Sequence, residues 1–323
     1  MRVLVTGGAG YVGSFTVRHL LAQGHTVTVF DNLSTGHRRA VPAECLVVGD
    51  LRDADQVDQL LIVQRIEAVV HFAARCQVAE SVRDPALYYG NNLLYGLQLL
   101  ERCRRNGVKI FVFSSSCAVY GVPPQVPIAE EAPLAPIQAY GRTKLALEYA
   151  LRDYAAAYGL AAVALRYFNA AGAAPDGSLG EDHEPETHLI PRVLRVALGR
   201  ENAVEIFGTD YPTADGTCVR DYVHVEDLAT AHVLALHHAQ AGQFLAYNVG
   251  LGRGYSVREV IATAEEVTGR PIPVRSSPRR PGDPPVLIAD NRRICQEWGW
   301  QPRYTALRQM VATAWEWHRR QGR

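Results

Sequence analysis

The 323-residue sequence lacks an excess of either charge, since 33 Lys and Arg balance 33 Asp and Glu. Such a balance disfavours nucleic acid and anionic membrane surfaces as partners. No apolar run is long enough to span a bilayer, and the chain opens on the strand-like Arg2–Val5 without a signal-peptide pattern. We therefore expect a cytoplasmic protein with neither a nucleic-acid nor a membrane partner.

The cysteines also lack any clustering, and no C-x-x-C pair occurs. They are Cys45, Cys76, Cys103, Cys117, Cys218 and Cys295. This dispersal favours reduced thiols over a disulfide framework or a zinc site. His183 and His224 are of a metal-binding type, but no second ligand is suitably spaced along the sequence. We therefore expect both to make structural hydrogen bonds, and we expect no bound metal.

What the first half does contain is an alternation of short apolar runs with amphipathic stretches. The apolar runs are Val3–Thr6, Thr26–Phe30, Cys45–Val48, Ala68–Phe72, Ile110–Ser114 and Ala162–Arg166. The amphipathic stretches are Tyr11–Gln23, Asp53–Gln64, Pro85–Asn106 and Tyr140–Tyr158. Buried strands joined by helical crossovers predict an α/β fold, in which a doubly wound parallel Rossmann sheet is covered on both faces.

The composition changes after about Asn169, where Gly and Pro become frequent over residues 170–180 and 271–285. We predict a Rossmann domain over residues 1–168, to which later segments such as 223–240 return. Residues 169–323 are expected to form mainly a smaller mixed α/β domain that closes over the carboxyl edge of the sheet. The long helices Pro85–Asn106 and Tyr140–Tyr158 are candidates for a homodimer interface, although packing on the sheet explains them equally well.

A glycine-rich loop follows the first predicted strand, with Gly7, Gly10 and Gly13 spaced as G-x-x-G-x-x-G before a helix. Glycines there permit a tight turn and the close approach of a pyrophosphate to the helix N-terminus. Asp31 follows the second strand, where a carboxylate accepts both ribose hydroxyls and repels a 2′-phosphate, which favours NAD over NADP. A turn-capping role is the alternative for Asp31. Asp50 ends the third strand near an expected adenine, or caps the next helix.

Tyr140 and Lys144 stand at positions i and i+4 of a predicted helix and therefore share one face. A nearby ammonium favours the phenolate of a tyrosine, whose pKa is ordinarily ~10. Such a pair supplies a base for a sugar hydroxyl, although the spacing also occurs by chance on helix surfaces.

The glycine loop, the Tyr140/Lys144 pair and the serines at Ser114–Ser116 together resemble the extended short-chain dehydrogenase/reductase family. Further motifs make the chain similar, over residues 1 to about 317, to the UDP-glucose 4-epimerases of that family. These motifs are His71–Ala74, Ser114–Gly121, Arg166–Asn169, Gly180–His183, Glu186–Pro191, Asp210–Thr213, Asp215–Thr217, Val219–Val225 and Arg279–Asp283.

The resemblance implies that Tyr140 removes the C4 hydroxyl proton, that Ser116 relays it, and that Lys144 lowers the Tyr140 pKa and holds the nicotinamide ribose. The implied NAD-binding residues are Gly7, Gly10, Tyr11, Val12, Gly13, Asp31, Asn32, Asp50, Leu51, Phe72, Ala73, Ala74, Asn91, Ser114, Tyr140, Lys144 and Tyr167. The implied UDP-sugar-binding residues are Ser116, Tyr140, Asn169, His188, Leu189, Ile206, Phe207, Arg220, Arg280, Asp283 and Leu287. Ile206 and Phe207 would line the uracil pocket.

The sequence departs from the family pattern at three places. Cys76 replaces a common lysine, so a phosphate contact is lost or comes from Arg75. Ala139 replaces a common proline, with little expected effect. Leu287 stands where relatives strict for unsubstituted hexoses carry Tyr and relatives accepting N-acetylated sugars carry a smaller residue. We therefore expect some turnover of N-acetylhexosamines.

Several alternatives stay open for the activity and for two arginines. Arg220 could pair with Asp221, and Arg279 is expected to form a surface ion pair. A UDP-pentose 4-epimerase, a decarboxylase or a non-catalytic NAD-sensing module shares the scaffold. A 4,6-dehydratase needs an acid after Ser116, where this chain has Cys117–Val119.

Overall fold

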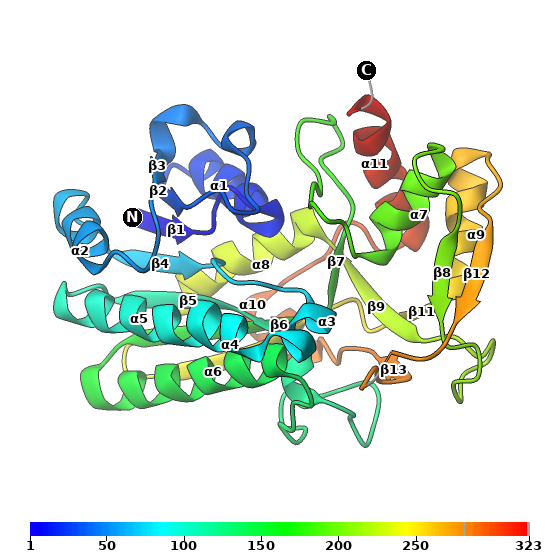
Figure 1. Ribbon diagram of the computed structural model, residues 1–323. Helices are drawn as coiled ribbons and strands as arrows, with labels where there is room; N and C mark the ends of the chain where they lie inside the picture. The colour runs from blue at the N-terminus through cyan, green and yellow to red at the C-terminus, as the bar shows by residue number, and fades with distance from the viewer. Residues whose placement is uncertain (281, 322–323) are drawn as a thin grey trace.

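The computed structural model describes residues 1–280 and 282–321 and has a seven-stranded sheet at its centre (Figure 1). The strand order is β10-β6-β5-β4-β1-β2-β3, and every neighbouring pair is parallel. The strands are β1 (Arg2–Thr6), β2 (Thr26–Asp31), β3 (Leu46–Val48), β4 (Ala68–His71), β5 (Ile110–Ser116), β6 (Ala161–Tyr167) and β10 (Phe244–Val249). The predicted doubly wound Rossmann sheet is confirmed.

Helices cover both faces of this sheet because strand side chains alternate between the faces. Val3 and Val5 lie in one core, whereas Leu4 between them lies in the other. The first core is shared with α1 (Tyr11–Ala22), α8 (Val225–His238) and α10 (Arg292–Trp298). The second is shared with α2 (Ala54–Val63), α5 (Tyr95–Arg105) and α6 (Ala139–Tyr158).

Two boundaries differ from the prediction in ways that matter for the site. Strand β5 continues to Ser116, so all three serines belong to its carboxyl end. The helix predicted over Pro85–Asn106 is divided into α4 (Pro85–Tyr88), a π-helical stretch (Tyr89–Leu94) and α5. π-Helical turns are frequent at functional sites, and the helical periodicity of the sequence does not predict them.

A second layer of smaller elements lies beside the carboxyl edge of the sheet, at the right of Figure 1. Its strands are β7 (Asn169–Ala171), β8 (Val204–Phe207), β9 (Val219–His224), β11 (Gly254–Ser256), β12 (Val274–Ser277) and β13 (Val286–Leu287). Its helices α7 (Leu189–Ala197), α9 (Val257–Thr268) and α11 (Leu307–Arg320) share a separate apolar core. The short elements α3 (Val78–Arg83), η1 (Arg38–Ala40), η2 (Ala43–Cys45) and η4 (Cys117–Tyr120) complete the described chain.

After β9 the chain continues through α8 to β10, which pairs with β6 of the seven-stranded sheet. No helix of the part just described is both long and apolar enough to span a membrane. All six cysteines are free thiols, in agreement with the absence of a disulfide framework.

Candidate functional site

The strand order reverses between β1 and β4, and doubly wound folds bind ligands outside the carboxyl ends of the strands at such a point. The glycine loop lies at this point. Gly7 has a φ of 71°, and a Cβ on it would lie 2.5 Å from the Ala73 nitrogen. A Cβ on Gly13 would lie 2.4 Å from the Gly7 oxygen. Both positions therefore require glycine, which holds the N-terminus of α1 open to a phosphate.

Two acidic residues lie at the carboxyl ends of β2 and β3, on the side expected to hold the nucleotide. Asp31 is buried and accepts backbone hydrogen bonds from Ala9 at 2.9 Å and from Leu33 at 2.8 Å. Its turn-capping role is thus present, and the same carboxylate fixes the glycine loop. Asp50 pairs with Arg52 at 3.0 Å and accepts from Asn32 at 2.8 Å. The alternative that Asp50 caps α2 is wrong, because Asp53 does so.

The loop after β4 is fixed by an asparagine that the sequence reasoning missed. Asn92 is buried, accepts a hydrogen bond from the Arg75 nitrogen at 2.8 Å and donates one to the Arg75 oxygen at 2.9 Å. The predicted cofactor residue Asn91 donates to Asn92 at 2.9 Å. Both asparagines lie in the π-helical stretch, which explains how two adjacent residues turn toward one loop. Phe72, Ala73 and Ala74, also predicted for the cofactor, are half-buried in this loop.

The end of β5 and the start of α6 bring the predicted catalytic residues together. The Lys144 Nζ donates to the Ser114 carbonyl oxygen at 2.7 Å and lies 5.8 Å from the centre of the Tyr140 ring. Burial lowers the Lys144 pKa to about 8. The Ser114 hydroxyl is hydrogen-bonded to the Tyr167 hydroxyl. Lys144, Tyr140, Ser114 and Tyr167 therefore form one polar group at the sheet edge.

Tyr140 does not have the lowered pKa that the sequence suggested. Burial raises its pKa well above the ordinary value, Tyr167 raises it further, and the side chain of Ser116 opposes the shift by hydrogen bonding. Desolvation is the largest contribution to this shift, and the Lys144 ammonium lies over the ring face, where it donates a hydrogen bond to Ser114. The chain alone therefore keeps Tyr140 protonated.

A buried ion pair between β6 and α6 supports this edge of the sheet, and it was not predicted from the sequence. Arg166 on β6 and Glu148 on α6 lie 2.6 Å apart and are both almost fully buried. The Ser115 hydroxyl donates to Glu148 at 2.5 Å, and Arg166 also donates to Tyr120 at 3.0 Å. This network fixes β5 relative to α6. Its one signal in the sequence is a charged residue inside the apolar strand Ala161–Tyr167.

The smaller domain brings the predicted UDP-side arginines to the same edge. Arg220 pairs with Asp283, not with Asp221. Asp221 instead accepts backbone hydrogen bonds from Leu251 and Gly252 at 2.8 and 2.9 Å. Arg279 forms the predicted surface ion pair, with Asp210 at 2.7 Å. Pro281 of the quoted Arg279–Asp283 motif lies outside the described residues.

Arg280 lies over the Phe207 ring, 3.9 Å from its centre, in a cation–π contact. The predicted role of the Ile206 side chain in lining a base pocket is wrong. Ile206 is 2% exposed and packs in the core of the smaller domain. Neighbouring side chains of β8 point to opposite faces of the strand, so the Phe207 ring lies on the face opposite to Ile206.

The remaining residues that were predicted to bind the substrate lie on or next to β7, α7 and β13. Asn169 begins β7, and Leu189 begins α7 after His188 as its N-cap. Leu287 on β13 aligns with Arg220 of β9 and is buried. Its neighbours in a small apolar cluster include Cys117. Leu287, which was predicted to decide sugar size, therefore shares an apolar cluster with the residue that follows Ser116.

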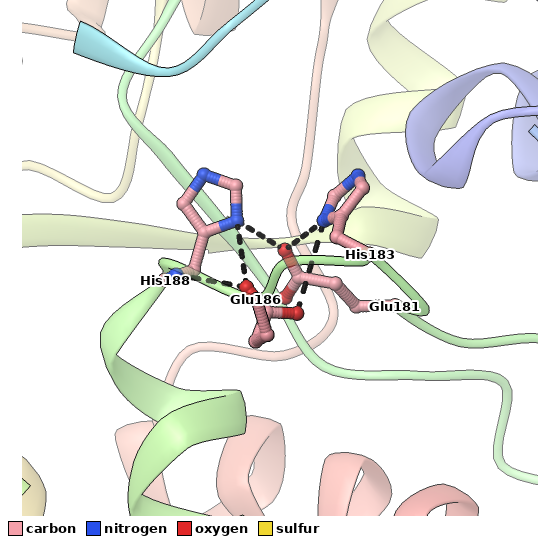
Figure 2. A group of neighbouring side chains, drawn as sticks. All are labelled: Glu181, His183, Glu186 and His188. Carbon is pink, nitrogen blue, oxygen red and sulfur yellow. Dashed lines mark hydrogen bonds and ion pairs between the residues drawn. The ribbon is translucent and has the colours of Figure 1, made fainter. Parts of the chain in front are cut away.

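The two histidines considered as metal ligands differ. His224 makes the structural hydrogen bonds that were predicted, with Thr313 at 3.0 Å and the Glu226 nitrogen at 3.1 Å. For His183 no suitably spaced second ligand was expected from the sequence, but the fold brings three such side chains next to it. Ligand atoms of Glu181, His183, Glu186 and His188 all lie within 4.8 Å of one another (Figure 2).

Comparison with known proteins agrees with this geometry. Residues 3–250 match the model of the NAD dependent epimerase/dehydratase family. A UDP-glucose 4-epimerase of Corynebacterium glutamicum is 53% identical over 98% of this chain and 95% of its own length. The Brucella ovis UDP-glucose 4-epimerase in complex with NAD superposes with a TM-score of 0.93 at 49% identity, covering 97% of each chain.

The Bifidobacterium longum UDP-glucose 4-epimerase in complex with NAD+ and UDP superposes with a TM-score of 0.95 at 39% identity, over 100% of this chain and 99% of the other. These matches extend over both domains, so they include the nucleotide edge and the smaller domain together. The chain belongs to the NAD dependent epimerase/dehydratase family and, within it, to the UDP-glucose 4-epimerases.

Proposed function

We propose that this protein interconverts UDP-glucose and UDP-galactose by NAD-dependent epimerisation at sugar C4. One observation carries the proposal: Tyr140 and Lys144 lie beside the serine end of β5, at the same sheet edge as the glycine loop. Bound NAD would accept a hydride from C4 and return it to the other face of the 4-keto sugar. Because the cofactor ends as it began, one acid–base group suffices for both directions.

Tyr140 is the group that accepts the C4 hydroxyl proton and later returns it. Burial favours its neutral form, which suits the return of the proton to the ketone oxygen. A bound oxidised nicotinamide is cationic and would favour the phenolate when the proton must be accepted. Ser116 lies at the end of β5 and its side chain hydrogen-bonds with Tyr140, so it can orient the sugar hydroxyl.

Lys144 holds the nicotinamide ribose, and the glycine loop with Asp31 holds the adenosine half of NAD. The Asp31 carboxylate is already held by two backbone N–H groups, so it is oriented before any ribose arrives. A 2′-phosphate at that place would meet a buried negative charge, which supports NAD over NADP.

The smaller domain grips the UDP part through cations and one aromatic ring. Arg220 exchanges its Asp283 partner for a diphosphate oxygen, or shares it, because guanidinium forks suit both anions. Phe207, with Arg280 stacked on its ring, forms one wall of the uracil region, and His188 with Leu189 presents the N-terminus of α7. Burial lowers the Arg280 pKa from its usual value, but the group stays cationic at neutral pH.

Leu287 supports some tolerance for an N-acetyl group at C2. Its side chain belongs to an apolar cluster that reaches Cys117, so its volume limits the space behind the sugar. Leucine leaves more of this space than tyrosine does, and we therefore infer activity on UDP-N-acetylgalactosamine as well.

We also infer a cytoplasmic homodimer. Large apolar side chains are exposed on the π-helical stretch and on α6, among them Leu94 at 58%, Tyr149 at 48% and Tyr158 at 58%. Burial of these side chains against a second copy would remove apolar area from water. Light scattering tests this, and Leu94→Glu should shift the mass from two chains toward one.

The deciding experiment incubates the purified protein with UDP-galactose and follows the sugar product by NMR. We expect UDP-glucose to form with no net NADH. A 4-keto-6-deoxy product would indicate a dehydratase, and CO2 release from UDP-glucuronate would indicate a decarboxylase. Bound NAD with no product from any UDP-hexose or UDP-pentose would favour a sensing module. Accumulation of NADH in proportion to substrate would contradict the epimerase.

A further inference from the structure

The loop between β7 and α7 contains a cluster of four side chains that the epimerase chemistry does not use as a unit. They are Glu181, His183, Glu186 and His188. Figure 2 shows both imidazoles turned toward the two carboxylates. The His188 Nδ1 lies 2.5 Å from Glu181 Oε1 and 3.5 Å from Glu186 Oε1. The His183 Nδ1 lies 3.2 Å from Glu181 Oε1 and 3.8 Å from Glu186 Oε2.

The two carboxylates of the cluster are shielded from water. The side chains of Glu181 and Glu186 are 5% and 3% exposed, and that of His183 is 19% exposed. With neutral imidazoles the four groups carry two negative charges in a small volume. Buried charge of this kind must be compensated, either by a proton on each imidazole or by one divalent cation.

One buried nitrogen in the cluster has no hydrogen-bond partner within the described part of the chain. Among the described residues 1–280 and 282–321, the His183 Nδ1 is one of a few buried side-chain atoms that have no hydrogen-bond partner. It lies 3.2 Å from Glu181 Oε1, a hydrogen-bonding distance with poor direction, and 3.8 Å from Glu186 Oε2, which is too long. A buried nitrogen that faces two carboxylates without bonding either is an independent indication of a missing ligand.

The spacing of the donor atoms suits a metal ion. A tetrahedral shell with bonds of ~2.1 Å separates its donor atoms by about 3.4 Å. The four nitrogen–oxygen separations span 2.5 to 3.8 Å and bracket this value. Two imidazoles with two carboxylates are a donor set for borderline ions such as Zn²⁺, whereas Mg²⁺ and Ca²⁺ prefer oxygen alone.

We propose that Glu181, His183, Glu186 and His188 bind one divalent transition-metal ion of the zinc type. The ion links the loop to its surroundings. The ring of Tyr11 packs edge-on against His183 at 6.4 Å between centroids. The Trp317 indole N–H of α11 donates to the backbone carbonyl oxygen of Glu181 at 3.1 Å. His188 occupies the N-cap position of α7, so an ion bound to its side chain would hold the start of that helix in place.

This role is structural: Tyr140 and Lys144 are not ligands, and of the residues proposed to hold the UDP-sugar only His188 belongs to the cluster. Metal binding must displace the protons that otherwise neutralise the cluster. Tyr11, Cys76 and His318 are titratable groups on neighbouring elements that interact with the charges of the cluster.

The test uses the tag-free holoenzyme, treated with a chelator and titrated with Zn²⁺ or Co²⁺ alone. We expect one Zn²⁺ per chain, and visible absorption bands of tetrahedral Co²⁺ that Zn²⁺ abolishes. His183→Asn and Glu186→Gln should each weaken binding by more than about 10-fold, since even outer partners of ligands contribute that much. His37→Asn is the matched control, because His37 pairs with Asp182 in the same loop but is not a ligand.

Thermal unfolding supplies a second readout. Saturating Zn²⁺ should raise the Tm of the wild type and of His37→Asn, and should leave the Tm of His183→Asn unchanged. Equal zinc affinity of the wild type and His183→Asn would overturn the proposal, as would a Co²⁺ spectrum without tetrahedral bands. Either outcome would leave the cluster as a proton-neutralised ion-pair network.

Discussion

The Lys144 ammonium donates a hydrogen bond to the Ser114 carbonyl oxygen at 2.7 Å while it is buried against the Phe113 ring. The carbonyl partly replaces the lost water, but burial still lowers the Lys144 pKa to about 8. Free lysine titrates near ~10.4, so the native state binds fewer protons than the unfolded state between about pH 8 and 10.4.

This difference predicts a pH dependence of stability. The cost of burying the cation is full below pH 8 and is relieved as the pH rises toward 10.4, so the free energy of unfolding should rise over that window. The slope is at most about 1.4 kcal/mol per pH unit relative to Lys144→Met. Urea unfolding of both proteins from pH 7 to 10.5 measures it. Parallel curves would show that Lys144 is not buried as a cation.

Tyr140→Phe should lower kcat by at least ~10²-fold, the lower range for loss of a general acid–base group. Phenylalanine keeps the edge-on contact with Tyr88, so folding and NAD retention should be unchanged. Tyr158→Phe, on the same helix but 58% exposed, is the control and should retain its kcat. Near-normal turnover of Tyr140→Phe would remove this residue from the mechanism.

Glu148→Ala should lower the free energy of unfolding by about 3–5 kcal/mol, because it leaves Arg166 buried without its partner. Glu101→Ala is the comparison, since Glu101 pairs at the surface with Arg104 and Arg105 and should cost about 1 kcal/mol or less. Chemical denaturation measures both. Equal losses would mean that the Arg166 pair is hydrated.

Leu287→Tyr should reduce kcat/KM for UDP-N-acetylgalactosamine by about 10-fold or more relative to UDP-galactose. Added volume in the cluster around Cys117 must project toward the sugar, and such crowding costs about 1–3 kcal/mol. Leu287→Met conserves volume and should keep the wild-type ratio. Initial rates on both sugars provide the test, and an unchanged ratio in Leu287→Tyr would place sugar selection elsewhere.

Asp31 should make NAD bind at least ~10-fold more tightly than NADP, through repulsion of the 2′-phosphate by a fixed carboxylate. Fluorescence titration of the cofactor-stripped protein with each dinucleotide measures the ratio. Asp31→Asn keeps the acceptor oxygen and should narrow the ratio. Equal affinities in the wild type would argue against Asp31 at the ribose.

The nucleotide loop and the Tyr140/Lys144 pair were predictable because each is local. Glycine spacing and an i, i+4 pair fix their own geometry once the strand–helix order is known. The pairing of Arg220 with Asp283 and of Arg166 with Glu148 was not predictable, since it depends on elements far apart in the chain. The cluster around His183 was missed for another reason: its spacing fits neither helix nor strand, and an irregular loop brings the four side chains together.

The route of the chain between the two domains has a consequence for engineering. After β9 of the smaller domain, the chain supplies α8 and then β10, the edge strand of the seven-stranded sheet. A fragment ending near residue 168 would lack that edge strand and half of the helix pair α1–α8. The cofactor-binding half therefore cannot be transferred to another protein as a unit. Hybrids with other nucleotide-sugar enzymes must exchange whole chains or single loops.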